Sequence, residues 1–92
     1  MEEKFLAAWA QNREKAAALG VRMREVDANA LKNAHRILSG TRESDGFSLL
    51  AQKGRLDLSL EALVIDKRFT ALFSDDEANN ALDRLLGAGY KF

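Results

Sequence analysis

The chain contains a single histidine, His35, so this residue is the only imidazole that could act as a base or bind a metal. Imidazole-assisted catalysis also needs a nucleophile and an orienting acid nearby in space, and no motif in the sequence supplies them. On a helical wheel His35 lies beside Leu31 and Leu38, at the border of an apolar face. We therefore interpret His35 as a boundary residue that packs its ring against the core.

Three consecutive acids, Asp75, Asp76 and Glu77, form the densest group of carboxylates in the chain. Hard cations such as Mg²⁺ favour carboxylate ligands, so a metal site is one hypothesis for this cluster. The acids follow Ser74, however, and a serine with a glutamate three residues later is a capping box at a helix N-terminus. The helix dipole also favours acids in this first turn. We therefore expect a helix start here and no bound metal.

Other sequence patterns also fail to define a reaction centre. The loop of residues 43–46 lacks the alternating ligands and the closing glutamate of a calcium loop, and we interpret it as a turn. The pair Gly87 and Gly89 follows a helical pattern, whereas phosphate-binding loops follow a strand. The chain has no cysteine, which excludes disulfides, thiolate nucleophiles and zinc sites with sulfur ligands. We expect a non-enzymatic protein without a cofactor.

Composition predicts one soluble domain that covers residues 1–92. Hydrophobic residues make up 47% and charged residues 30% of the chain, which is an ordinary balance for a globular protein. The 14 basic and 14 acidic residues cancel, which weighs against nucleic acid as a partner without excluding a local basic patch. The N-terminus lacks the pattern of a signal peptide, and no apolar stretch approaches membrane-spanning length. We expect a cytoplasmic protein that does not contact membranes.

The elements that must position these residues are predicted to be helices. Proline is absent, and strong helix formers dominate. Gly20, Gly40, Gly54 and Gly87 each follow a periodic segment, where a left-handed residue would end a helix. The predicted fold is therefore an all-α, compact and irregular bundle of about five short helices.

Capping residues and apolar spacing give the expected bounds of these helices. Residues 55–60 alternate leucine with polar residues, which fits either a short strand or a loop, and we favour a loop that runs into a helix. Tyr90 and Phe92 are expected to fold back onto the core. The expected helices cover residues 2–19; a segment from an N-cap at Asp27 to Gly40; a segment from residue 44 or 45 to 53; residues 60–73 after an N-cap at Ser59, with a break near Asp66; and a segment from Asp75 to Gly87 or Gly89. The expected core consists of Phe47, Leu50, Leu63, Phe69, Phe73, Leu82 and Leu85.

Two groups of residues are candidates for binding another protein or a second copy of the chain. Phe5 and Trp9 lie one helical turn apart on an otherwise alanine-rich segment, where they could dock on a partner or cover the domain's own core. The second group is a polar hinge in which the arginines have no evident capping or core role, and exposed solvated charge explains it equally well. This hinge consists of Arg36, Arg42, Glu43 and Asp45. We expect an accessory or regulatory subunit, and a homodimer is one form that it could take.

The alternative is a DNA-binding protein. Residues 60–90 resemble the helix pair of winged helix-turn-helix proteins, because the segment ALDRLLGAGYKF is similar to the leucine-rich helix and Gly-Tyr exit that lead into a wing. The resemblance implies DNA contacts by Arg68, Arg84 and Lys91. The sequence departs from the family in two ways: it ends at Phe92, which leaves no wing, and the helix expected to read DNA opens with three acids that phosphate would repel.

Overall fold

The computed structural model describes residues 2–90, and in this range every regular element is helical. The prediction of an all-α fold is therefore confirmed. The α-helices are α1 (Glu2–Ala18), α2 (Ala30–Ser39), α3 (Phe47–Gln52), α4 (Leu60–Val64) and α5 (Asp75–Gly87), and two short 3-10 turns cover Leu56–Leu58 and Thr70–Leu72.

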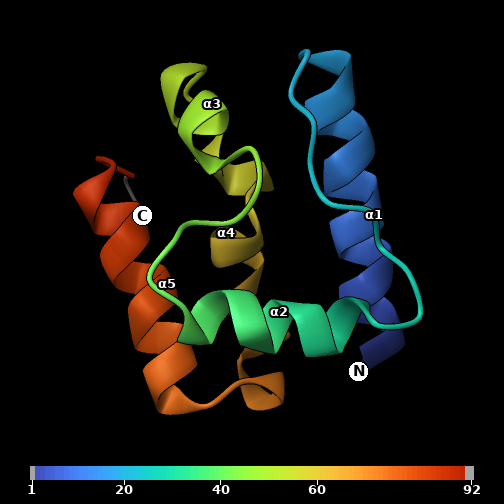
Figure 1. The fold of residues 1–92 in the computed structure, drawn as a ribbon, viewed down its shortest axis with the longest axis vertical. Helices are drawn as coiled ribbons and strands as arrows, with labels where there is room; N and C mark the ends of the chain where they lie inside the picture. The colour runs from blue at the N-terminus through green and yellow to red at the C-terminus, as the bar shows by residue number, and fades with distance from the viewer. Residues whose placement is uncertain (1, 91–92) are drawn as a thin grey trace.

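The helices surround one core (Figure 1). Helices α1 and α5 lie on opposite sides of the molecule, and α3 and α4 lie between them. Helix α2 crosses the lower part of the view at a steep angle and contacts both α1 and α5. The loop that leaves α2 therefore starts close to α5 and passes in front of α4.

Aromatic rings from α1 and from the segment just before α5 fill the centre. Phe5 in α1 is fully buried, and its ring centroid lies 5.4 Å from that of Phe69 and 5.3 Å from that of Phe73. Both pairs have the edge-on geometry that aromatic rings prefer. Trp9 packs one turn further along α1, with its ring centroid 5.9 Å from that of Phe5. The predicted core residues are buried except Leu82, which is partly exposed at the edge of the α5 stripe.

Capping residues in the sequence correctly predicted the starts of α4 and α5. The Ser74 side chain accepts a hydrogen bond from the Glu77 amide at 3.1 Å, and the Glu77 carboxylate accepts one from the Ser74 amide at 2.8 Å. This reciprocal pair is the predicted capping box at the start of α5. The Ser59 hydroxyl likewise accepts a hydrogen bond from the Ala62 amide at the start of α4.

Other bounds differ from the prediction. Helix α2 begins at Ala30, because the Asp27 carboxylate accepts a hydrogen bond from the Asn29 amide and forms a turn instead of an N-cap. Helix α3 begins only at Phe47, because Gly46 has a φ of 84°, in the left-handed region. Gly40 follows α2 with extended backbone, not the left-handed conformation expected for it.

The segment after residue 54 is more irregular than predicted. Residues 56–58 form a 3-10 turn, which excludes the strand reading of this segment. The expected break near Asp66 is present: α4 ends at Val64, because the Asp66 carboxylate accepts a hydrogen bond from the Arg68 amide and closes a turn. Tyr90 is half-buried and packs against the core, whereas Phe92 lies outside the described residues. Within residues 2–90 no helix has the length and apolarity needed to cross a bilayer.

Candidate functional site

The polar hinge predicted from the sequence lines a surface hollow of about 360 Å³. Its walls come from three segments that are separate in the sequence: the connector between α1 and α2, the last turns of α2, and the loop of residues 40–46. The structure brings all four predicted hinge residues together and adds a fifth charged residue, Arg24. The lining residues are Arg24, Arg36, Ile37, Gly40, Thr41, Arg42, Glu43 and Asp45. We call this feature the arginine hollow.

The loop below the arginine hollow is anchored by a buried acid. Glu61 in α4 is fully buried although it is charged. Its carboxylate accepts hydrogen bonds from the Ser44 amide at 2.9 Å and from the Ser44 hydroxyl at 2.5 Å. Ser44 is itself buried, so this contact ties the middle of the loop to α4.

Arg84 in α5 completes the anchor from the other side. Its guanidinium forms an ion pair with Glu61, with 3.3 Å between Nη1 and Oε2, and only 11% of its side chain is exposed. The same guanidinium donates hydrogen bonds to the carbonyls of Ile37 at 3.1 Å and Gly40 at 2.8 Å. The Ile37 carbonyl also accepts a hydrogen bond from the Gly40 amide at 3.2 Å, so Arg84 adds a donor at a helix end where intrahelical donors run out. We call Glu61, Ser44 and Arg84 the buried anchor.

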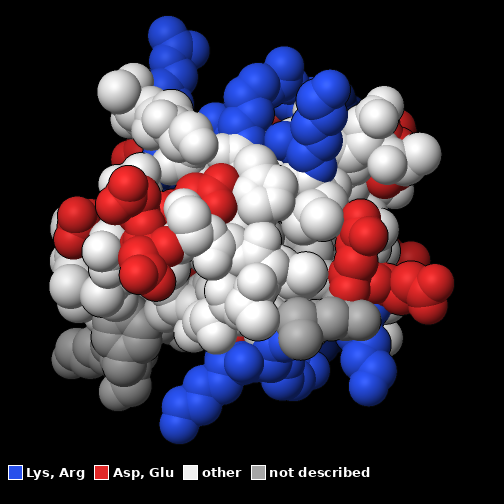
Figure 2. Space-filling view, turned by 90° about the horizontal axis from the view of Figure 1, so that it is seen from below, with Lys and Arg blue, Asp and Glu red and all other residues white. Residues whose placement is uncertain are grey.

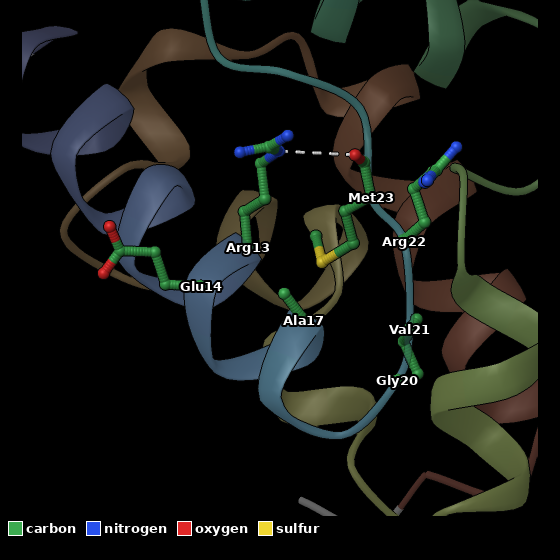
Figure 3. Close-up of a pocket in the computed structure, with 7 residues that line it drawn as sticks. All are labelled: Arg13, Glu14, Ala17, Gly20, Val21, Arg22 and Met23. Atoms are coloured by element: carbon green, nitrogen blue, oxygen red, sulfur yellow. Dashed lines mark hydrogen bonds between the residues drawn. The ribbon is translucent and has the colours of Figure 1, made fainter.

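The connector that carries Arg24 is held by Arg13 of α1. The Arg13 side chain donates a hydrogen bond from Nε to the Met23 carbonyl at 3.4 Å and lies 3.8 Å from the Glu25 carboxylate. Figure 3 shows Arg13 reaching across a second hollow to the Met23 carbonyl, while the side chain of Arg22 points away. Both neighbours of Arg24 are therefore attached to α1.

The charges of the arginine hollow are not neutralised by each other. Within residues 2–90 the side chains of Arg24 and Arg42 have no hydrogen-bond or ion-pair partner, and Arg36 donates only to the side-chain carbonyl of Asn33, at 3.2 Å. Glu43 and Asp45 lie exposed at the same rim without forming an ion pair there. The end of the molecule that carries α2 and the start of α5 shows Lys and Arg gathered separately from Asp and Glu (Figure 2).

His35 forms a structural link between α2 and α5. Its Nδ1 lies 2.7 Å from Oε2 of Glu77, and its ring packs against Phe73 with 5.0 Å between centroids. Burial acts to raise the pKa of Glu77, but hydrogen bonds from the Ser74 amide and from His35 outweigh it and leave the pKa below its usual range. Glu77 thus serves both the capping box and the contact with α2.

The predicted role of Phe5 and Trp9 in binding a partner disagrees with the structure. They are among the most deeply buried side chains of the described chain, so the hypothesis that they dock on a partner is wrong for this fold. The competing interpretation, in which both aromatics cover the domain's own core, agrees with the structure. Leu49 and Leu86 are the large apolar side chains left exposed among residues 2–90.

The residues named for DNA contact are not arranged as the resemblance implies. Arg84 belongs to the buried anchor, and its guanidinium is already bound to Glu61 and to two backbone carbonyls, which disfavours its predicted role. Arg68 is exposed but forms an ion pair with Asp66 at 3.0 Å and covers the Phe69 ring. Lys91 lies outside the described residues.

Sequence reasoning missed Glu61, Ser44 and Arg24. A signal for Glu61 was present, because it interrupts the apolar run from Leu60 to Ile65, where a charged residue implies burial with a partner. Ser44 was interpreted as the start of a helix, and no sequence pattern places Arg24 beside the hinge. Within residues 2–90 no three histidine or acidic side chains gather in a way that could hold a metal ion.

Comparison of the chain with models of protein families, with curated proteins and with solved structures gives no match.

Proposed function

We propose that the protein is a small non-enzymatic binding domain that acts as an accessory or regulatory subunit by contacting another protein. The arginine hollow is its contact surface. The observation that carries this proposal is the convergence of Arg24, Arg36 and Arg42 from separate segments onto one hollow, without acidic partners among the described residues. Arginine is enriched at the energetic centres of protein interfaces.

The buried anchor supports the proposal because it makes the surface rigid. A loop that is already ordered loses less conformational entropy on binding than a mobile one. Ser44 is bound to Glu61, and Gly40 is bound to Arg84, so the residues on both sides of Arg42 are fixed before a partner arrives. Buried polar groups hold an irregular loop in one conformation here. This arrangement is explained if the loop presents side chains to a partner.

The test is quantitative capture of a partner followed by reconstitution. The protein and the double variant Arg24→Glu/Arg42→Glu are immobilised, proteins captured from native extract are identified, and the leading candidate is purified and titrated by calorimetry. The double variant Lys15→Glu/Lys67→Glu is the matched control, because both lysines are exposed and lie outside the hollow. We expect the arginine variant to weaken binding by about tenfold or more and the lysine control to bind almost normally. Equal affinities for the two variants would contradict the proposal.

Light scattering tests whether the partner is a second copy. If the wild-type protein is a dimer through this surface, the arginine variant is expected to be a monomer and the lysine control a dimer. A dimer that persists in the arginine variant would place self-association elsewhere, for example at Leu49 and Leu86.

A further inference from the structure

The arginine hollow carries a net positive charge that is directed outward. Three arginines and two acids line it. The carbonyls at the end of α2, which form the negative end of that helix dipole, already accept hydrogen bonds from Arg84. Asn80 donates a further hydrogen bond to the Leu38 carbonyl at 2.8 Å. The helix end therefore cancels little of the positive charge at the rim.

The donors that remain are suited to carboxylates. Each guanidinium presents five N–H groups in a planar fork that can bind a carboxylate through two parallel hydrogen bonds. Arg24 and Arg42 have all their side-chain donors available with respect to residues 2–90, and Arg36 uses one nitrogen for Asn33. The half-buried Ile37 also lines the hollow and offers an apolar contact.

The volume of the arginine hollow and its two acidic residues favour a peptide over a nucleic acid as the ligand. A volume of about 360 Å³ is at the lower end for ligand sites and fits a few side chains. A nucleic-acid backbone carries closely spaced negative charge, and Glu43 and Asp45 would repel it. A peptide can place its carboxylates on the arginines and a polar or basic residue beside these two acids.

We infer that the arginine hollow binds a short acidic segment of a protein, with carboxylates on Arg24, Arg36 and Arg42 and an apolar side chain against Ile37. This inference rests on the proposed function and names the chemistry of the partner. Binding is expected to weaken as salt rises, because the three arginines are exposed.

The test uses fluorescence anisotropy with a labelled peptide in which glutamates flank one leucine. The comparison probes are the same peptide with glutamine in place of glutamate, and single-stranded oligothymidylate of similar length. The protein variants are Arg24→Ala/Arg42→Ala, the control Lys15→Ala/Lys67→Ala, and Glu43→Gln/Asp45→Asn. Circular dichroism confirms that each variant keeps its helices.

We expect the acidic peptide to bind wild-type protein and the lysine control similarly, and the arginine variant about tenfold more weakly. The variant without the two acids is expected to bind more tightly than wild type. The glutamine peptide is expected to bind far more weakly than the acidic one.

Three results would overturn the inference: no binding of the acidic peptide, equal binding of the glutamine peptide, or tighter binding of oligothymidylate. These results are separable from failure of the proposed function. If a purified protein partner depends on the hollow but the acidic peptide does not bind, the function stands and the acidic chemistry is wrong. If the peptide binds but no protein partner or second copy depends on the hollow, the proposed function fails.

Discussion

Arg84 is the residue on which the buried anchor depends most. Its guanidinium is paired with the fully buried Glu61 and also satisfies two backbone carbonyls. Removal of one partner from a buried ion pair leaves an uncompensated charge in the interior, which typically costs about 3–5 kcal/mol. We therefore expect Arg84→Ala to lower the free energy of unfolding by about this amount in urea denaturation.

Arg68→Ala is the matched control, because Arg68 forms its ion pair with Asp66 at the exposed surface. Exposed pairs are screened by water and contribute little. The control is expected to unfold at nearly the wild-type urea concentration. Comparable losses in the two variants would show that Arg84 does not anchor the loop.

Glu77 should make the stability of the protein depend on pH at the acid end. Hydrogen bonds outweigh burial and lower the pKa of Glu77 in the folded state. Its contribution is therefore fully present above the pKa of an unfolded glutamate and is lost as pH falls through the lower folded pKa. We expect Glu77→Gln to be less stable than wild type at neutral pH and the difference to shrink below the ordinary carboxyl range.

Urea midpoints measured across a pH series check this expectation. Asp83→Asn is the control, because Asp83 is an exposed acid on the same helix. Its difference from wild type is expected to be small throughout the series. A difference between Glu77→Gln and wild type that stays constant down to strongly acidic pH would contradict the assignment.

Among the elements, the loop of residues 40–46 packs against the connector at Gly46. Its φ of 84° disfavours any side chain, and a Cβ there would lie 2.9 Å from Val21 Cγ1 and 3.0 Å from the Arg22 carbonyl. Gly20 has a similar φ of 81° but open space around it. We expect Gly20→Ala to cost about 1 kcal/mol from backbone strain alone. Gly46→Ala is expected to cost about 1–3 kcal/mol more from crowding.

Urea unfolding of the two alanine variants measures the difference directly. The result also bears on the arginine hollow, because Arg24 and Arg42 lie on the two segments that meet at Gly46. Equal costs for the two substitutions would mean that the connector does not pack closely on the loop.

Helix ends with an unambiguous local signal were predicted well, and a helix end whose local signal fits two structures was not. The start of α5 follows from Ser74 and Glu77, which need only each other. Asp27 was expected to cap α2 but bonds the Asn29 amide in a turn, and the sequence alone does not distinguish these two uses of an aspartate. The break after α4 was expected near Asp66, and there the Asp66 carboxylate accepts a hydrogen bond from the Arg68 amide.

Across the whole molecule, four of the five charged residues of the arginine hollow could be predicted from the sequence. Arg36, Arg42, Glu43 and Asp45 are close together in the chain, so their proximity in space could be expected. Arg24 joins them only because the connector turns back along α1, where Arg13 contacts Met23 and Glu25. That path depends on long-range packing, which periodicity does not encode.

The same arrangement predicts weak binding to duplex DNA through residues 60–90. Only 11% of the Arg84 side chain is exposed, and the first turn of α5 carries Asp75 and Asp76 at the surface. Titration of a labelled duplex at two salt concentrations is expected to show little affinity, unchanged in Arg68→Glu. Salt-sensitive binding that Arg68→Glu abolishes would restore the DNA-binding alternative.

Binding at the arginine hollow is tested by a nitrogen-15 correlation spectrum of the protein titrated with the glutamate-leucine peptide. We expect amide shifts to concentrate in the connector around Arg24, in the last turn of α2 and in the loop of residues 40–46. Shifts confined to the first turn of α5, or to the surface around Leu49 and Leu86, would show that the arginine hollow is not the binding surface.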